Sequence, residues 1–303
     1  MKERIVVLLI KILPKETKNK IKKIILKLKS KNPKLFTFLN GTFNDDDIIK
    51  EFERKNLIKE FDILMVHSSI NNLVPMYQGN VGTLLSALID YSKKKNITLV
   101  MPAFVLGKKN KGVKEFYSKK KEFDVEKTPT TVGLLNEMFR RKKNVYRSLH
   151  PTHSVAAYGP KAQELTEKHH LSSTTFGEDT PFGIMNSYKT VIFGVGVYYY
   201  RNLTHVHVIE DLLKEKFPYP IERTYINIPV DMFYKEKRYT YNLKCYTDNL
   251  SNRRDLTVIA KNIAKPDLLQ WSYKGVPMFI ANAGEVTNTL LKLSREGKSI
   301  YKA

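Results

Sequence analysis

Short apolar runs rich in β-branched residues alternate along this chain with segments of helical periodicity. The runs that predict buried strands are residues 63–69, 97–104, 189–197 and 277–283. The segments that place apolar residues three and four positions apart, and so predict helices, are residues 82–95, 132–143, 160–170 and 285–297. Strands and helices in alternation predict an α/β fold, here a three-layer sandwich around a central mixed, largely parallel sheet.

Two later segments alternate apolar and polar residues and are separated by a charged turn. These are residues 224–233 and 237–246, which predict an added antiparallel strand pair. The second contains Cys245, the only cysteine of the chain, which excludes an internal disulfide and a multi-cysteine zinc site. Because Cys245 lies far along the chain from the histidine segments described below, we expect a structural thiol.

Residues 108–127 form a lysine-rich stretch between a predicted strand and a predicted helix. It is longer than an ordinary connection in an α/β fold. A long loop at such a position is either a lid over a substrate or a solvated insertion. In both cases Phe116 and Tyr117 are its apolar anchors.

The N-terminal segment is strongly basic. Residues 1–36 contain twelve Lys or Arg and two Glu, and Ile21, Ile24, Ile25 and Leu28 form one apolar stripe. We therefore divide the chain into a basic amphipathic helical segment, residues 1–40, and a main domain, residues 41–303. Such a helix fits the surface of an anionic membrane, or packs on the protein or on another subunit of a homo-oligomer. It lacks the interleaved aromatic residues of a nucleic-acid binder.

Composition sets broad limits. The 303 residues are 42% hydrophobic and 27% charged, as in a globular protein, with a net charge of +22. A lysine-rich composition bias accounts for part of this excess. The remainder favours anionic partners over cationic ones.

Four of the seven histidines lie in two short segments, RSLHPTHSVAAYG at residues 147–159 and THVHVIE at residues 204–210. Histidine is the side chain best suited to take a proton from an amine at neutral pH. On a helix, Glu210 lies three residues after His207 and can hold that ring in one tautomer. This spacing predicts a general base with its own orienting carboxylate, and it places His205 on another face.

Several segments in register carry a family resemblance. They are VHSSINNL at 66–73, GNVGTLLSAL at 79–88, TLVMPAF at 98–104, TPTTVGLLNEMFRR at 128–141, FGEDTPFGIM at 176–185 and the two histidine segments. In this order the chain, over residues 61–214, resembles the coenzyme A dependent aminoglycoside 3-N-acetyltransferase family, also called the antibiotic N-acetyltransferase family. The resemblance implies that residues 41–303 form an acyl-CoA-dependent N-acyltransferase domain, with acetyl-CoA or another short-chain acyl-CoA as co-substrate and no metal.

The resemblance also implies roles for particular residues. The implied catalytic residues are His207, Glu210 and His150. The implied coenzyme contacts are Ser68, Ser69, Gly79, Thr83, Thr131, Arg147 and Ser148. The implied substrate contacts are His67, Thr204 and Glu178. The chain departs from the family at Asn80, where two adjacent glycines are usual.

The predicted function is transfer of an acetyl or other short acyl group from coenzyme A to a primary amine of an amino sugar. Because the chain is so basic, we expect a nucleotide- or lipid-linked sugar used in surface polysaccharide synthesis, and a cytoplasmic enzyme held near the inner membrane face. One alternative is an aminoglycoside 3-N-acetyltransferase that confers antibiotic resistance. Others are a metal-dependent enzyme built on Glu210 and the four histidines His150, His153, His205 and His207, and a non-catalytic protein that binds anionic surfaces.

Overall fold

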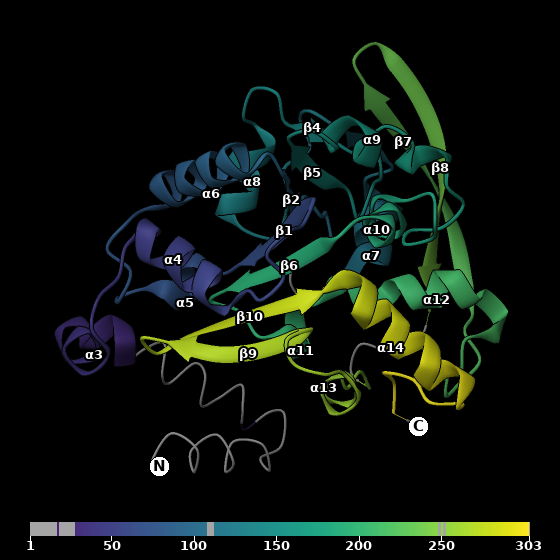
Figure 1. The fold of residues 1–303 in the computed structure, drawn as a ribbon. Coiled ribbons are helices and arrows are strands. Elements are labelled where there is room, and N and C mark those ends of the chain that lie inside the picture. Colours follow the sequence, from purple (N-terminus) through teal and green to yellow (C-terminus); the bar gives the residue numbers. More distant parts are fainter. Residues whose placement is uncertain (1–16, 18–27, 108–111, 248–249, 251–252, 303) are drawn as a thin grey trace.

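A seven-stranded sheet runs through the molecule in the order β4-β5-β2-β1-β6-β10-β9 (Figure 1). The computed structural model describes residues 17, 28–107, 112–247, 250 and 253–302. The strands of this sheet are β1 (Ile63–Ser68), β2 (Thr98–Pro102), β4 (Tyr146–Arg147), β5 (Val155–Tyr158), β6 (Thr190–Val195), β9 (Leu268–Tyr273) and β10 (Val276–Asn282). The four strands predicted from apolar runs are β1, β2, β6 and β10.

The mixed sheet is confirmed, but its parallel part is smaller than the sequence pattern predicts. β1 pairs in parallel with β2 and with β6. The other four pairings are antiparallel. The difference comes partly from β10, which runs antiparallel to β6, and partly from β4, β5 and β9, whose short length, alanines or polar residues hide the strand signal. Three strands therefore bring their carboxyl ends to one edge, and this edge carries the site described below.

Side chains alternate between the two faces of the sheet, as the pleat requires. Leu64 and Val66 of β1 point into one buried cluster, and Ile63 and Met65 point into another. Helices α4 (Asp45–Lys55), α6 (Val81–Lys95) and α8 (Leu134–Arg140) contribute to the first cluster. Helices α9 (Ala162–Thr166), α10 (Pro181–Ile184), α12 (Val208–Leu213) and α14 (Ala283–Arg295) contribute to the second. The three-layer sandwich is confirmed (Figure 1).

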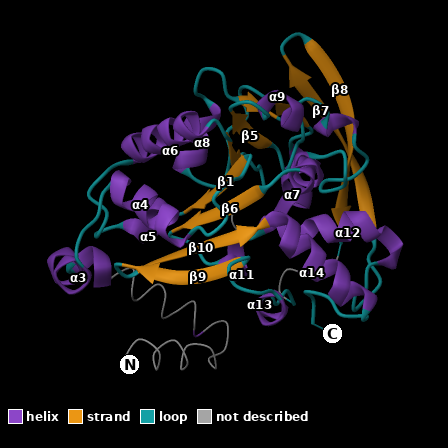
Figure 2. Ribbon diagram, in the orientation of Figure 1, coloured by secondary structure: helices purple, strands orange, loops and turns teal. Residues whose placement is uncertain are grey.

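The predicted antiparallel pair is also confirmed, as β7 (Tyr225–Tyr234) and β8 (Lys237–Tyr246). Figure 2 shows these long strands running along one side of the molecule. A short strand, β3 (Glu122–Asp124), joins β7 in parallel, and α7 (Gly112–Lys119) packs beside the pair. The segment predicted as a long loop is thus partly helix and strand. Tyr117 is fully buried there, and Cys245 is a buried free thiol.

Short elements complete the chain. They are α3 (Pro33–Asn40), α5 (Ile70–Leu73), α11 (Tyr199–Asn202), α13 (Thr257–Asn262) and the 3-10 helices η1 (His169–Leu171), η2 (Met185–Ser187), η3 (Thr204–His207) and η4 (Lys214–Lys216). The amphipathic stripe predicted from Ile21 to Leu28 lies almost wholly outside the described residues. No helix in the described part of the chain is long and apolar enough to cross a membrane.

Candidate active site

A cavity of about 240 Å³ opens at the carboxyl ends of β1 and β2. In open α/β sheets this is the edge where ligands bind. The residues that line it are His67, Ser68, Pro102, Phe104, Leu106, Val132, Asn136, His153, Arg201, Asn202, Thr204, His207 and Arg254. Three histidines and two arginines thus face one small space, and no Asp or Glu appears among the described residues that line it.

His207 and Glu210 form a close pair beside this cavity. His207 Nδ1 lies 2.5 Å from Glu210 Oε1. The backbone is not the single regular helix that the spacing suggested, because η3 ends at His207 and α12 begins at Val208. The three-residue separation still brings the side chains together. His205 faces away and bonds through Nε2 to Asn186 Oδ1 at 2.9 Å, as predicted for another face.

The Glu210 carboxylate is surrounded by donors from distant parts of the chain. Tyr301 Oη lies 2.6 Å from Oε1, while Tyr219 Oη and Arg223 Nη1 lie 3.1 and 3.0 Å from Oε2. Burial by itself would raise the pKa of Glu210, but His207, Tyr301 and Arg223 outweigh it and hold the pKa at about 2. An ionised carboxylate only accepts, so the proton of the imidazole lies on Nδ1 and the basic lone pair on Nε2.

His207 Nε2 has a partner of its own, Arg254. Arg254 Nη1 lies 2.8 Å from this nitrogen. The Arg254 backbone forms an isolated bridge with Tyr301, and Asp255 N donates to Ile300 O at 2.7 Å. The C-terminal segment therefore contacts both members of the His207–Glu210 pair. Four residues around the pair were missed from the sequence, since nothing in their local pattern connects them to His207; they are Arg254, Tyr301, Tyr219 and Arg223.

Two of the predicted first-strand residues line the cavity. His67 is buried at the end of β1, and burial lowers its pKa to about 4, so the ring is neutral. Its Nε2 has no hydrogen-bond partner among the described residues. Ser68 also lines the cavity, whereas Ser69 donates its backbone N–H to Val195 O at 2.9 Å and leads into α5. Ser68 is therefore the better placed of the two serines.

The predicted coenzyme contacts at the start of α6 are engaged in capping that helix. Asn80 Oδ1 accepts from the N–H groups of Gly82 and Thr83 at 2.8 and 3.1 Å, and Thr83 Oγ1 accepts from Asn80 N. Gly79 lies against the Tyr77 ring, which leaves no room for a Cβ. The departure from the family at Asn80 thus supplies a capping box, which uses the N–H groups that a phosphate would need.

Arg147 bonds only inside the protein. Its Nη1 donates to Val125 O and Thr128 O at 3.0 and 2.6 Å, its Nη2 to Ala103 O at 2.8 Å, and its Nε to Ser154 Oγ. Burial lowers the pKa of Arg147 to about 9. A guanidinium so fully used has little left to offer a phosphate.

Ser148 and Thr131 do not line the cavity, and both are bonded inside the protein. Ser148 Oγ lies 2.9 Å from His169 Nδ1 and accepts from Val155 N. Thr131 N donates to Phe104 O, and Thr131 Oγ1 accepts from Leu106 N at 3.0 Å. The geometry gives no support to direct coenzyme contacts by these two residues.

Of the two histidines in the first histidine segment, only His153 lines the cavity. His150 is fully buried, its Nδ1 accepts from the backbone N–H of Thr152 and of His153, and it does not line the cavity. His153 lines the cavity, although the family resemblance implied no role for it. Burial, together with the nearby His207 and His169, lowers the pKa of His153 to about 3, so it is a neutral ring.

The predicted substrate residues divide in the same way. Thr204 lines the cavity at the start of η3. Glu178 is exposed and does not line it. Phe176 of the same segment does not line the cavity either, but its ring centroid lies 5.0 Å from that of His153 and 5.4 Å from that of His207, both of which do. This packing holds the two histidines on the same wall.

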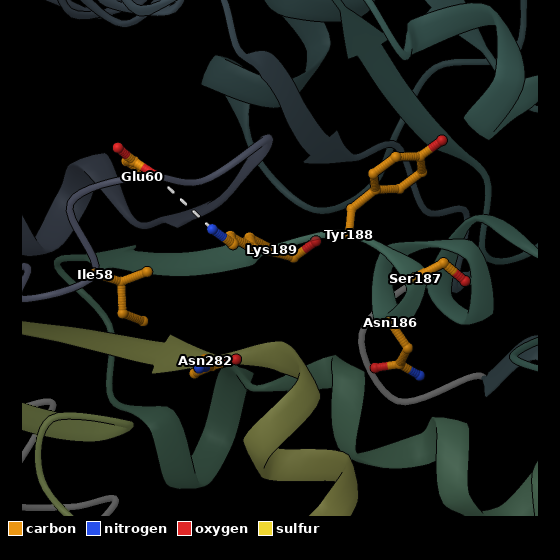
Figure 3. A pocket seen from close by; sticks show the side chains of 8 residues that line it. Ile58, Glu60, Asn186, Ser187, Tyr188, Lys189 and Asn282 are labelled. Atoms are coloured by element: carbon orange, nitrogen blue, oxygen red, sulfur yellow. Dashed lines mark ion pairs between the residues drawn. The ribbon is translucent and has the colours of Figure 1, made fainter.

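A larger hollow of about 610 Å³ lies at the opposite edge, near the start of β6 (Figure 3). Lys189 crosses it toward Glu60, 3.9 Å away. Its lining contains no histidine, and hence no histidine–carboxylate pair, among the described residues. No group of three or more His, Cys, Asp or Glu side chains in the described ranges is arranged to hold a metal. The smaller cavity is therefore the candidate active site.

Solved structures share this fold. A protein named YokD from Bacillus subtilis is 21% identical, with a TM-score of 0.64 over 82% of this chain and 92% of its own. The aminoglycoside acetyltransferase AAC(3)-Xa is 15% identical, with a TM-score of 0.70 over 89% and 99%. The enzyme AAC-IIIb, solved with CoASH, is 18% identical, with a TM-score of 0.66 over 86% and 100%. No curated protein sequence matches the chain.

The sequence itself matches a family model over residues 65–288, which is well over half of the chain. This model represents the aminoglycoside 3-N-acetyltransferase family. The match spans every residue that lines the cavity, from His67 to Arg254, and the His207–Glu210 pair. The chain belongs to the aminoglycoside 3-N-acetyltransferase family and is an acetyl-CoA-dependent N-acetyltransferase.

Proposed function

We propose that His207 is the general base of this acetyltransferase and that Glu210 orients it. The observation that carries the proposal is the ionised Glu210 carboxylate 2.5 Å from His207 Nδ1, because it leaves Nε2 as the basic atom on the cavity side. His207 takes a proton from the acceptor amine while the amine nitrogen forms a bond to the acetyl carbonyl carbon. The carbon–sulfur bond breaks, and the thiol leaves with a proton.

Direct transfer within a ternary complex fits this site better than a covalent acyl-enzyme. The only cysteine, Cys245, is buried in β8 and does not line the cavity. Ser68 lines it, so its hydroxyl is our candidate donor to the oxyanion that develops on the acetyl group. His67 and His153 are neutral rings on the same wall and are further candidate donors.

The acceptor is, in our proposal, a primary amine of an amino sugar, and the comparisons favour an aminoglycoside. Structures of related fold include AAC-VIa bound to sisomicin and an AAC(3)-IVa mutant in complex with apramycin. On this reading the alternative function, aminoglycoside acetylation with antibiotic resistance as its result, has more support than a role in polysaccharide synthesis. An aminoglycoside binds through its ammonium groups, for which carboxylates are the natural partners.

One observation favours a second candidate, an amino sugar that carries an acidic group. Arg201 and Arg254 line the cavity, and no carboxylate does so among the described residues. A polycation that enters a cavity with two guanidinium groups meets like-charge repulsion. A phosphate or carboxylate on the acceptor finds two partners there.

The test is release of thiol from acetyl-CoA with a panel of amines that contains sisomicin, apramycin, glucosamine and a nucleotide-linked amino sugar. We expect His207→Ala to lower kcat by about 10²- to 10⁴-fold, the usual contribution of a general base. His170→Ala is the matched control, since His170 packs on Tyr239 outside the cavity. Equal turnover by the wild type and His207→Ala would remove His207 from the mechanism.

A further inference from the structure

The atom that must accept the proton is already hydrogen-bonded in this structure. Arg254 Nη1 lies 2.8 Å from His207 Nε2. A guanidinium is always a donor, and Glu210 fixes the imidazole proton on Nδ1, so the lone pair of Nε2 is shared with Arg254. An acceptor amine cannot give its proton to Nε2 while Arg254 holds it.

The carboxylates around Arg254 are engaged elsewhere. Glu210 bonds to His207, Tyr219, Arg223 and Tyr301. Asp211 accepts from the backbone N–H of Phe176 at 2.7 Å, and Asp255 pairs with Lys302 at 2.8 Å. Among the described residues no carboxylate forms an ion pair with Arg254 or with Arg201, which also lines the cavity. Two guanidinium groups thus face the space where the acceptor must bind.

We propose that Arg254 is a specificity-determining residue, which selects an acceptor that carries a phosphate or carboxylate near its amine. The acidic group takes over the Arg254 guanidinium, and the same movement frees His207 Nε2 for the amine. This inference rests on the proposed role of His207 as the base. It explains why the cationic side chain of Arg254 is hydrogen-bonded to His207 Nε2 in an enzyme that must bind an amine.

The acidic group belongs to the acceptor and not to the acyl donor. Arg254 touches His207, and the thioester carbonyl must lie beside the same ring for transfer to occur. The extended pantetheine arm separates that carbonyl from the phosphates of coenzyme A. Those phosphates therefore cannot reach Arg254 in a reactive complex.

The experiment compares glucosamine with glucosamine 6-phosphate as acceptors, at saturating acetyl-CoA, in the wild type, Arg254→Gln and Arg254→Lys. Arg253→Gln is the matched control, because Arg253 is the exposed neighbour and does not line the cavity. A third arm adds free inorganic phosphate to glucosamine and so separates an attached anion from a free one.

We expect the wild type to prefer the phosphorylated sugar in kcat/KM by about 10- to 100-fold, the contribution of hydrogen bonds to a charged group. Arg254→Gln should lower this preference toward one, through a loss on the phosphorylated sugar and a gain on glucosamine, because Nε2 is then no longer held by a guanidinium. Arg254→Lys should retain part of it, because a lysine keeps the charge but not the planar fork. Arg253→Gln should behave as the wild type. Equal use of both sugars by the wild type, or an unchanged preference in Arg254→Gln, overturns the proposal.

Binding gives a readout that does not depend on turnover. Calorimetry measures how much more tightly glucosamine 6-phosphate than glucosamine binds to the coenzyme-loaded wild type and to Arg254→Gln. If the wild type binds glucosamine 6-phosphate more tightly and Arg254→Gln does not, the role of Arg254 is supported. This holds even if no amine is acetylated, a result that would reject only the proposed role of His207 as the base. Turnover without any Arg254-dependent preference rejects only the selection of an acidic acceptor.

Discussion

Glu210→Gln tests the electrostatic centre of the site through stability as well as rate. The depressed pKa means that the folded state holds the ionised carboxylate more strongly than the unfolded chain does. The stability that the ionised Glu210 carboxylate contributes is therefore present above about pH 4.5 and is lost as the pH falls toward 2. A fall in pKa from 4.5 to about 2 corresponds to about 3 kcal/mol of folding free energy at pH 7, of which about 2 kcal/mol is lost by pH 3.

The assay is denaturant unfolding of the wild type and Glu210→Gln at pH 7 and at pH 3. The buried neutral histidines also destabilise the protein on acidification, but both variants share that loss, so the difference between them isolates Glu210. We expect Glu210→Gln to be less stable by about 3 kcal/mol at pH 7, because Arg223 loses a buried counter-ion, with a smaller gap at pH 3. Glu178→Gln, at an exposed position, is the control.

One result would refute this reasoning. If the wild type and Glu210→Gln lost the same free energy of unfolding between pH 7 and pH 3, Glu210 would not be ionised and stabilised in the folded state. The assignment of the imidazole proton to Nδ1 would then lose its basis. A preserved gap in stability together with unchanged kcat would instead separate the carboxylate from catalysis.

The geometry supports three further predictions. Arg147→Lys should lower the free energy of unfolding by about 2–4 kcal/mol, because buried carbonyls lose their hydrogen-bond donors. The KM for acetyl-CoA should stay within about twofold of the wild-type value. A raised KM at unchanged stability would favour a coenzyme contact instead. Tyr301→Phe should cost about 1–2 kcal/mol and lower kcat severalfold by loosening Glu210, with exposed Tyr146→Phe as the control. Cys245→Ala should lower stability by about 1–2 kcal/mol and keep full transferase activity, which a covalent thioester enzyme could not do.

The sequence predicts most of the fold where hydrophobic periodicity is strong. β1, β2, β6 and β10 are continuous apolar runs, and the strand pair β7–β8 shows clean alternation. β5 reads VAAY, and alanine gives little strand signal, while polar residues interrupt β9. β5 and β10 flank the parallel core and run antiparallel to it, and β9 pairs antiparallel with β10. The sheet therefore contains less parallel pairing than the pattern predicts.

The His207–Glu210 pair was predictable because it is local. A separation of three residues brings His207 to Glu210 in a helix or a 3-10 turn alike. The coenzyme roles predicted for Arg147 and Ser148 rested on the family resemblance and on residue type, which say what a side chain can bind but not whether it is already bonded. Burial and internal carbonyl partners decide that question, and they depend on the tertiary fold.

Folding of the C-terminal segment creates the part of the site that no local pattern could reveal. Arg254 and Tyr301 form a backbone bridge with one another; Arg254 contacts His207, and Tyr301 contacts Glu210. The Tyr301 contact therefore supports the tautomer through Glu210, and the Arg254 contact controls the availability of Nε2. If an acidic acceptor withdraws Arg254, the backbone bridge stays in place and Tyr301 continues to hold Glu210. His207 Nε2 then becomes free while Glu210 keeps the ring oriented. This arrangement suits an enzyme in which Arg254 both selects the acceptor sugar and controls access to Nε2.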